Sequence, residues 1–256
     1  MLYSLPASII KDKRGICEHL ARLILEGKFK RNEILPNELD LAKGFGVSRT
    51  LMRDILRSLE GKGLIERKAH TGTRVRGIHS WNLLDSEVLN WGSVIFSQQR
   101  LFVSLLELRL IIEPQAAALS AMRANHDELQ NIHSSFEEML ESDSDGDIEQ
   151  INPQGDMAFH EAIINASGNL FISQFGGVIR AALFHTISSS VRALHDHSES
   201  IENHRRLLNA IESRNPQQAY AAMVQVLQRT LTDMKILNPG IILSDLGNNN
   251  QDVAIP

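Results

Sequence analysis

The chain contains 256 residues, of which 43% are hydrophobic and 22% are charged. These proportions suit a globular protein with a buried core, and the length favours two modest domains over one. The single cysteine, Cys17, excludes an internal disulfide framework and a cysteine-rich zinc module. No run of about 18 apolar residues occurs, and residues 1–14 lack the apolar segment of a signal peptide. We therefore expect a cytoplasmic protein with no membrane partner.

The charge is divided unevenly along the chain. Residues 1–80 contain 16 Lys and Arg against 9 Asp and Glu, a net charge of +7, whereas residues 81–256 contain 10 against 22, a net charge of −12. This asymmetry indicates an N-terminal part that binds a polyanion and an acidic part with another role. The predicted domains are residues 1–78 and 96–237, with a bridging linker at 79–95 and a tail at 238–256.

The basic part begins with three predicted helices. Apolar side chains recur at helical spacing over residues 14–26, before Gly27. A short second helix follows Asn37 and ends near Gly46. Ser48 is a suitable N-cap for a third helix, which has an apolar stripe. Two helices joined by a tight glycine-containing turn form the helix-turn-helix pattern.

The third helix presents cations on one face. Arg49 and Arg53 are four residues apart and so share that face, while Ser48 and Thr50 complete its first turns. A recognition helix places such side chains at the major groove, where arginine can pair with guanine and hydroxyl groups can contact phosphates. The alternative is a solvated cationic face without a nucleic-acid partner.

Two β-prone runs, residues 64–68 and 73–76, predict a small hairpin. Its tip would bring Lys68, His70 and Thr71 to a minor groove or to phosphates. Three helices followed by a two-stranded wing define a winged helix, and this combination favours DNA binding over a merely solvated face.

The sequences LPNELDLA, VSRTLMRDIL and LEGKGLI occupy residues 35–42, 47–56 and 59–65. They resemble the signature of the GntR superfamily of bacterial transcription regulators. The resemblance implies a homodimer that places the third helix and the wing tip in the grooves of a palindromic operator, read by the side chains named above. Two positions depart from the common pattern, Leu39 and the tip residues 69–71.

Beyond residue 95 the sequence predicts an antiparallel helical bundle. Pro114 lies inside its first long helix and is expected to kink that helix or start a new turn. The expected fold is therefore mainly α, a winged helix-turn-helix with a small β-hairpin wing followed by an all-α bundle. The bundle helices are predicted at residues 101–123, 127–141, 152–166, 170–196, 200–213 and 216–237.

Asp156 and His160 are candidate metal ligands, because a spacing of four residues places a carboxylate and an imidazole on one helix face. His204 lies on another predicted helix and is a third candidate. The alternatives are a structural polar pair or a metal-dependent enzyme that activates water. Glu161 adjoins His160 but points to another face, so no general base is evident.

These residues also resemble the FCD domain of the FadR branch of GntR regulators. The resemblance lies in the Asp156–His160 pair, in His204 and in the pattern of residues 108–117. It implies a divalent metal held by one Asp and three His, with a carboxylate effector completing the coordination. The third family histidine falls at Val226, so a three-ligand site for Zn, Ni or Mn is expected unless another histidine replaces it. The candidate replacements are His185, His195 and His197.

Arg109 is expected to face the bundle interior, where an arginine needs a carboxylate partner. That partner is Glu113, Asp156 or the effector. The linker at residues 81–91 resembles that of regulators of sugar-acid catabolism. This implies a repressor relieved by an aldonate or hexuronate, which Arg109 and Ser200 would contact. The alternative effectors are another organic acid or a fatty-acid-like ligand.

Overall fold

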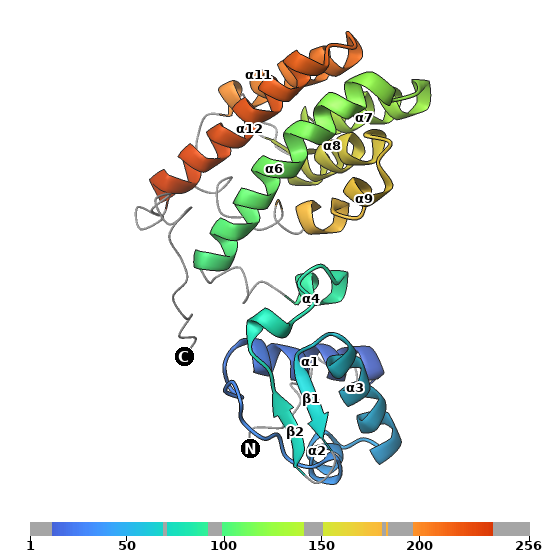
Figure 1. Ribbon diagram of the computed structural model, residues 1–256, viewed down its shortest axis with the longest axis vertical. Coiled ribbons are helices and arrows are strands. Elements are labelled where there is room, and N and C mark those ends of the chain that lie inside the picture. Colours follow the sequence, from blue (N-terminus) through green and yellow to red (C-terminus); the bar gives the residue numbers. More distant parts are fainter. Residues whose placement is uncertain are drawn as a thin grey trace, which may run out of the picture. The chain divides into compact units, whose positions relative to one another are not determined.

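The computed structural model describes residues 12–68, 71–91, 99–140, 151–180, 183 and 197–237. The chain divides between residues 97 and 98 into two compact units, called here the winged-helix unit and the bundle unit (Figure 1). The expected tail at 238–256 lies outside the described residues, as does His70 of the predicted wing tip.

Three capped helices form the body of the winged-helix unit. The side chains of Asp12, Asn37 and Ser48 each accept a hydrogen bond from a backbone N–H in the first turn of the helix that follows, at 2.7, 3.0 and 3.1 Å. The third helix packs against the first two and against the first strand. The helices are α1 (Lys13–Leu25), α2 (Glu38–Phe45) and α3 (Arg49–Gly61).

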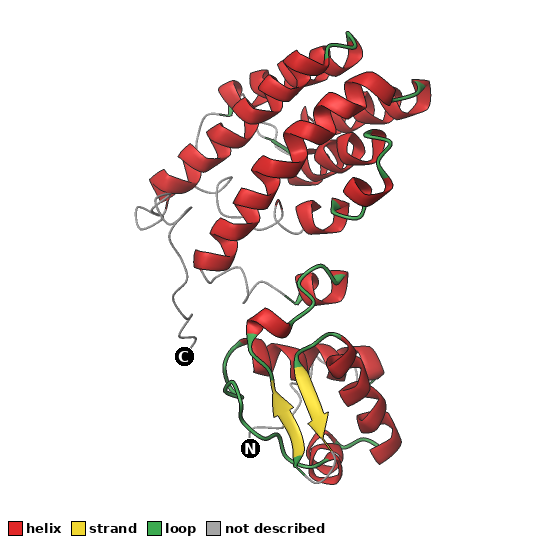
Figure 2. Cartoon of the chain, viewed as in Figure 1, coloured by secondary structure: helices red, strands yellow, loops and turns green. Residues whose placement is uncertain are grey.

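The wing is a two-stranded antiparallel sheet of β1 (Ile65–Lys68) and β2 (Gly72–Val75), drawn as yellow arrows in Figure 2. Ile65 lies opposite Val75, and both are buried, so this end of the hairpin belongs to the core. The register then places Lys68 opposite Gly72 at the exposed tip. The predicted helix-turn-helix with a hairpin wing is confirmed.

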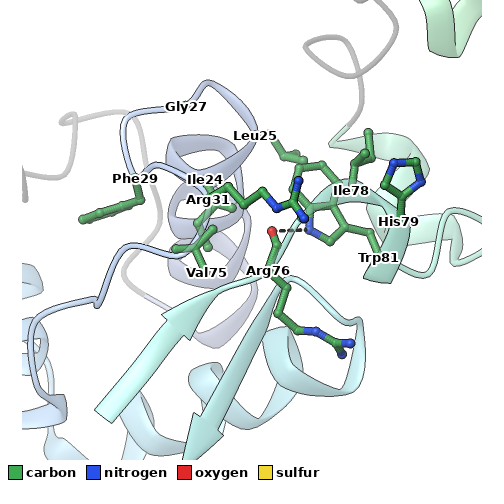
Figure 3. Close-up of a pocket in the computed structure, with 11 residues that line it drawn as sticks. Ile24, Leu25, Gly27, Phe29, Arg31, Val75, Arg76, Ile78, His79 and Trp81 are labelled. Atoms are coloured by element: carbon green, nitrogen blue, oxygen red, sulfur yellow. Dashed lines mark hydrogen bonds between the residues drawn. The ribbon is translucent and has the colours of Figure 1, made fainter. Parts of the chain in front are cut away.

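The linker begins with a 3-10 turn, η1 (Ile78–Ser80). Trp81 is half-buried and lines a pocket of the winged-helix unit, and its indole N–H donates to the carbonyl of Arg76 at 3.1 Å (Figure 3). Gly63 has a φ of +78°, and a Cβ there would lie 2.0 Å from the carbonyl oxygen of Ser80. A glycine is therefore required where the linker crosses the end of α3.

A short helix, α4 (Ser86–Asn90), follows and is tied to α3 through Lys62. The Lys62 ammonium lies 2.8 Å from Asp85 and 2.7 Å from Glu87, and 5.6 Å from the centroid of the buried Trp91 ring. The linker helix is thus fixed to the C-terminal end of α3 by a cation that is itself 12% exposed.

The bundle unit is helical throughout its described part. Helix α6 continues through Pro114 as one element. The predicted single helix over residues 170–196 is wrong, because the chain turns at residues 174–175, where the amides bond to carbonyls only three residues back, before helix resumes at 176–180. The helices are α6 (Gln99–Arg123), α7 (His126–Leu140), α8 (Pro153–Ala166), α9 (Leu170–Ser173), α11 (Ser198–Glu212) and α12 (Pro216–Leu237).

One large apolar cluster joins α6, α7, α8, α11 and α12. Helix α6 packs on α12 and α8, α7 packs on α8, and α11 packs on α12. Burying this cluster removes apolar surface from water, which is the main stabilisation of such a bundle. None of the helices in the described ranges is long and apolar enough to cross a membrane. Central members of the cluster are Ile132, Phe136, Phe159, Ile163, Ile211 and Met223.

Candidate DNA-reading face and metal centre

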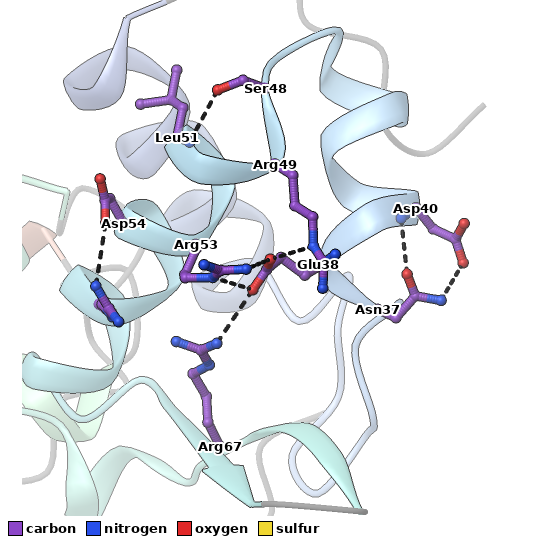
Figure 4. A network of polar contacts seen from close by, with 10 residues as sticks. Asn37, Glu38, Asp40, Ser48, Arg49, Leu51, Arg53, Asp54 and Arg67 are labelled. Atoms are coloured by element: carbon purple, nitrogen blue, oxygen red, sulfur yellow. Dashed lines mark hydrogen bonds and ion pairs between the residues drawn. The ribbon is translucent and has the colours of Figure 1, made fainter.

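The candidate DNA-reading face is organised around one carboxylate, Glu38, at the start of α2. It accepts hydrogen bonds from Arg49 Nε at 2.8 Å and Arg53 Nη2 at 3.0 Å, both on α3. Arg67 of the wing reaches the same carboxylate at 3.4 Å. Figure 4 shows the three guanidinium groups converging on Glu38. One glutamate therefore links the second helix, the third helix and the wing.

The arginines of this cluster remain accessible to solvent. The side chains of Arg49 and Arg53 are 63% and 41% exposed, whereas that of Glu38 is 15% exposed. The hydrogen bond from Arg53 is the largest cause of the lowered pKa of Glu38, and Arg49 adds to it. Glu38 is therefore ionised at neutral pH and orients two cations whose remaining N–H groups can meet a polyanion.

The other predicted reading residues lie on the same unit, in different roles. Ser48 uses its hydroxyl group to cap α3. Thr50 and Thr71 are exposed, and Lys68 is 64% exposed with its ammonium 3.2 Å from Glu66. Glu38 and Arg67 were missed by sequence reasoning. The available signal was the position of the glutamate in the LPNE segment, at the first residue of the helix that leads to the helix-turn-helix corner.

The bundle unit brings the three predicted metal ligands together. Asp156 and His160 on α8 and His204 on α11 are all buried, and one ligand atom of each lies within 4.8 Å of the others. Asp156 Oδ1 is 3.4 Å from His160 Nε2 and 3.2 Å from His204 Nε2. Such separations suit atoms that share a cation with bonds of about 2.0–2.2 Å.

The two imidazoles are oriented by their other ring nitrogens. His160 Nδ1 lies 2.6 Å from Glu113 Oε2, and His204 Nδ1 donates to the carbonyl of Ser200 at 2.7 Å. Both Nε2 atoms therefore face Asp156. Asp156 Oδ1 and His204 Nε2 are buried and have no hydrogen-bond partner. Buried polar atoms without partners are costly, and a bound divalent cation would satisfy them. The residues present thus fit a metal ion.

Electrostatics keep the carboxylates of this centre ionised. Burial alone would raise the pKa of Asp156, but His160 and His204 outweigh it and lower that pKa well below its usual range. Burial would likewise lower the pKa of His160, but Glu113 and Asp156 raise it to about 9. In the absence of metal, the extra proton on His160 therefore balances part of the negative charge of Glu113 and Asp156. A bound divalent cation would replace that proton and balance the same charge.

Arg109 on α6 lies on the far side of Glu113. Its Nε donates to Glu113 Oε1 at 2.5 Å, so Glu113 is the carboxylate partner that the sequence left open among three. Burial would raise the pKa of Glu113, but Arg109 and His160 lower it to about 2. Both Nη atoms of Arg109 are buried without a hydrogen-bond partner. Ser200 is half-buried and contacts the site through its backbone carbonyl group, which accepts the hydrogen bond from His204 Nδ1.

No fourth ligand joins the cluster within the described ranges. Val226 is 3% exposed and belongs to the apolar core. His197 is buried at the start of α11 but is not part of the cluster, and His185 and His195 lie outside the described residues. Gly155, beside Asp156, sets the position of α8, since a Cβ there would lie 2.2 Å from the backbone nitrogen of Met139 on α7.

A winged helix-turn-helix joined to a helical unit with a buried polar centre defines a DNA-binding transcription regulator with a sensor domain. Residues 13–75 match the family "Bacterial regulatory proteins, gntR family", and residues 104–229 match the FCD domain. The chain belongs to the GntR family, and its C-terminal part is an FCD domain.

Three relatives extend this assignment over most of the chain. The uncharacterized HTH-type transcriptional regulator YieP of Escherichia coli K12 is 30% identical, with 83% of this chain and 91% of that protein covered. The galactonate operon transcriptional repressor of the same strain is 29% identical, with 84% and 93% covered. The Glc operon transcriptional activator of this strain is 29% identical, with 91% of this chain and 95% of that protein covered. The chain is thus a transcription regulator rather than an enzyme.

Proposed function

We propose that this regulator represses an operon of sugar-acid catabolism and is released from DNA by a small carboxylate effector, an aldonate or a hexuronate. The effector binds with a divalent metal ion in the bundle unit of a cytoplasmic homodimer that reads a palindromic operator. The observation that carries the proposal is the buried centre, where Asp156 and His204 have unpartnered ligand atoms and the Nη atoms of Arg109 are also free of hydrogen bonds.

Asp156, His160 and His204 would hold the metal ion, which when bound supplies a Lewis acid for carboxylate and hydroxyl oxygens. Arg109 offers two parallel N–H groups, the geometry that binds a carboxylate in a bidentate manner. Ser200 lies one turn before His204 and is the proposed contact for an effector hydroxyl group. Zn, Ni and Mn are the candidate ions.

The galactonate operon repressor among the relatives supports a sugar-acid effector, and the relatives include regulators of both signs. One represses the galactonate operon and another activates the Glc operon. An effector that binds one conformation better shifts operator affinity by about 1–3 kcal/mol, or about 5–150-fold. For a repressor, this shift weakens DNA binding. Operator affinity measured with and without effector therefore gives the sign.

Metal content tests the sensor site. The purified protein is expected to carry about one divalent ion per chain, and His160→Ala is expected to lose it. His133→Ala, at a histidine of α7 that is 53% exposed, is the matched control and keeps the ion. A panel of aldonates, hexuronates, short hydroxy acids and fatty acids is then screened by thermal shift. Stabilisation by a class other than sugar acids overturns the effector assignment, and a metal-free wild type overturns the site.

DNA reading is tested by affinity for the fragment that the wild-type protein selects from a random pool. Arg53→Ala is expected to weaken specific binding by about 1–3 kcal/mol, or about 5–150-fold. Arg22→Ala on α1 removes a side chain that is also 41% exposed and serves as the control. Equal losses in the two variants would overturn the assignment of α3 as the recognition helix.

A further inference from the structure

Glu113 occupies a position that neither metal binding nor effector binding by itself explains. Its side chain is fully buried, and its two oxygens serve different partners. Oε1 accepts from Arg109 Nε at 2.5 Å, on the same helix one turn earlier, and Oε2 lies 2.6 Å from His160 Nδ1 on α8. One carboxylate thus joins the candidate effector arginine to a candidate metal ligand.

The contact with His160 determines which ring nitrogen is available. A carboxylate at Nδ1 keeps the proton on that nitrogen, which leaves the lone pair of Nε2 directed at Asp156. His204 has a different support, because its Nδ1 donates to the neutral carbonyl of Ser200. The two imidazoles therefore differ, and only His160 has an anionic partner that strengthens it as a ligand.

The contact with Arg109 orients the guanidinium group without saturating it. Glu113 uses only Nε, and the two Nη atoms remain buried without partners. A side-on contact of this kind fixes the plane of the guanidinium group and keeps its fork free for a second carboxylate. Without Glu113, the same arginine would be an unpaired buried cation.

We infer that Glu113 is a positioning residue that sets the tautomer of the metal ligand His160 and the plane of Arg109 through its two oxygens. This inference rests on the proposed function, because it assigns Glu113 to the same metal and effector site. Metal affinity and effector affinity then depend on a residue that touches neither the ion nor the effector.

The test is a Glu113→Gln substitution, which keeps the side-chain size and removes the charge. Zinc affinity is measured by competition with a chromophoric chelator. We expect affinity to fall about 10–100-fold, the usual effect of losing such a supporting group. Glu107→Gln makes the same charge change on a half-buried residue of α6 and should stay within about twofold of wild type. Equal zinc affinity in Glu113→Gln and wild type overturns the inference.

A spectroscopic readout separates positioning from a general loss of structure. In zinc-loaded protein with 15N-labelled histidine, wild-type His160 is expected to show a protonated Nδ1 and a coordinated Nε2. Glu113→Gln is expected to show a mixture of ring states at His160 and an unchanged pattern at His204. An unchanged pattern at both histidines overturns the inference. A wild type that binds no zinc overturns the proposed function as well.

A second variant covers the case in which Glu113→Gln does not fold. The double variant Arg109→Gln/Glu113→Gln removes both charges, so no unpaired arginine remains buried. Its zinc affinity is compared with that of Arg109→Gln alone, which keeps the carboxylate beside His160. We expect the double variant to bind zinc about tenfold more weakly than the single variant. Equal affinity in this pair contradicts the role of Glu113.

Discussion

Each unit of this regulator gathers cations around one glutamate, and the two clusters differ in their access to water. Glu38 in the winged-helix unit holds arginines that are 41% and 63% exposed. Glu113 in the bundle unit is buried together with Arg109 and His160. In the exposed cluster, the N–H groups of the arginines that Glu38 does not use remain open to DNA, whereas the buried cluster is closed to water on all sides. Burial, rather than residue type, decides which role a charged cluster can have.

The largest expected effect compares the two glutamates directly. Glu113→Ala should lower the free energy of unfolding of the metal-free bundle unit by about 3–5 kcal/mol, because Arg109 is left as an unpaired buried charge. Glu38→Ala should cost less than about 1 kcal/mol in the winged-helix unit. Urea unfolding measures both, with tryptophan fluorescence reporting the winged-helix unit, which contains Trp81 and Trp91. Similar costs would contradict the comparison.

The stability of the metal-free bundle unit should depend on pH through the titration of His160. Burial alone would lower the pKa of His160, but Glu113 and Asp156 raise it to about 9 in the folded state, from 6.5. Its stabilisation is therefore full below pH 6.5 and is lost as the pH rises to about 9. Urea midpoints in a chelating buffer should fall over this interval, and His160→Gln should flatten the fall. A wild-type midpoint that is constant from pH 6.5 to 9 would refute the expectation.

At the other end of the pH scale the sign reverses. The pKa of Glu113 is lowered from 4.5 to about 2, so its stabilisation is present above pH 4.5 and is lost as the pH falls toward 2. The same urea series extended to acid, with Glu113→Gln as the reference, measures this loss. An identical acid profile in the variant would show that Glu113 does not contribute.

A smaller effect is expected for DNA specificity when Glu38 is neutralised. Glu38→Gln should reduce the ratio of operator affinity to random-DNA affinity by about tenfold, the equivalent of one charged hydrogen bond of about 1.5 kcal/mol. The cause is freer orientation of Arg49 and Arg53, while removal of a negative charge favours non-specific binding. Competition binding with both DNAs measures the ratio. Glu26→Gln, at an exposed residue that follows α1, is the control, and a ratio that is unchanged in both variants would contradict the role of Glu38.

The smallest effect concerns salt. The contribution of Glu38 to unfolding should vanish near 1 M NaCl, where the Debye length is about 3 Å, whereas that of Glu113 should persist. The difference between wild type and each alanine variant, measured at low and high salt, gives both quantities. A Glu113 contribution that screens as readily as that of Glu38 would show that water reaches the bundle centre.

Local signals in the sequence were sufficient for most of the fold. Ser48 and Asn37 cap the helices they were expected to start, and the hairpin lies where β-prone runs flank Gly72. The prediction of one helix over residues 170–196 was wrong because apolar residues keep their helical spacing through the turn at 174–175. The spacing therefore gives no sign of the turn. Helix α9 ends at Ser173 because the next two amides, those of residues 174 and 175, donate to carbonyl groups three residues back rather than four.

The candidate site was only partly accessible from the sequence. The spacing of Asp156 and His160 predicts one shared face, and His204 was the third candidate on another predicted helix, but only the structure shows that the three ligand atoms lie within 4.8 Å of one another. The branching of Glu113 toward both Arg109 and His160 could not be predicted, because it depends on how α6 crosses α8. The convergence of the wing on Glu38 is likewise a tertiary contact that no local pattern encodes.

The close approach of α8 to α7 at Gly155 limits which mutations the bundle unit can tolerate. Only a hydrogen atom fits there beside the backbone of Met139, so any side chain would displace the helix that bears Asp156. A substitution at this glycine would therefore disturb the proposed metal site from a distance, while the winged-helix unit, which folds around its own core, would stay intact.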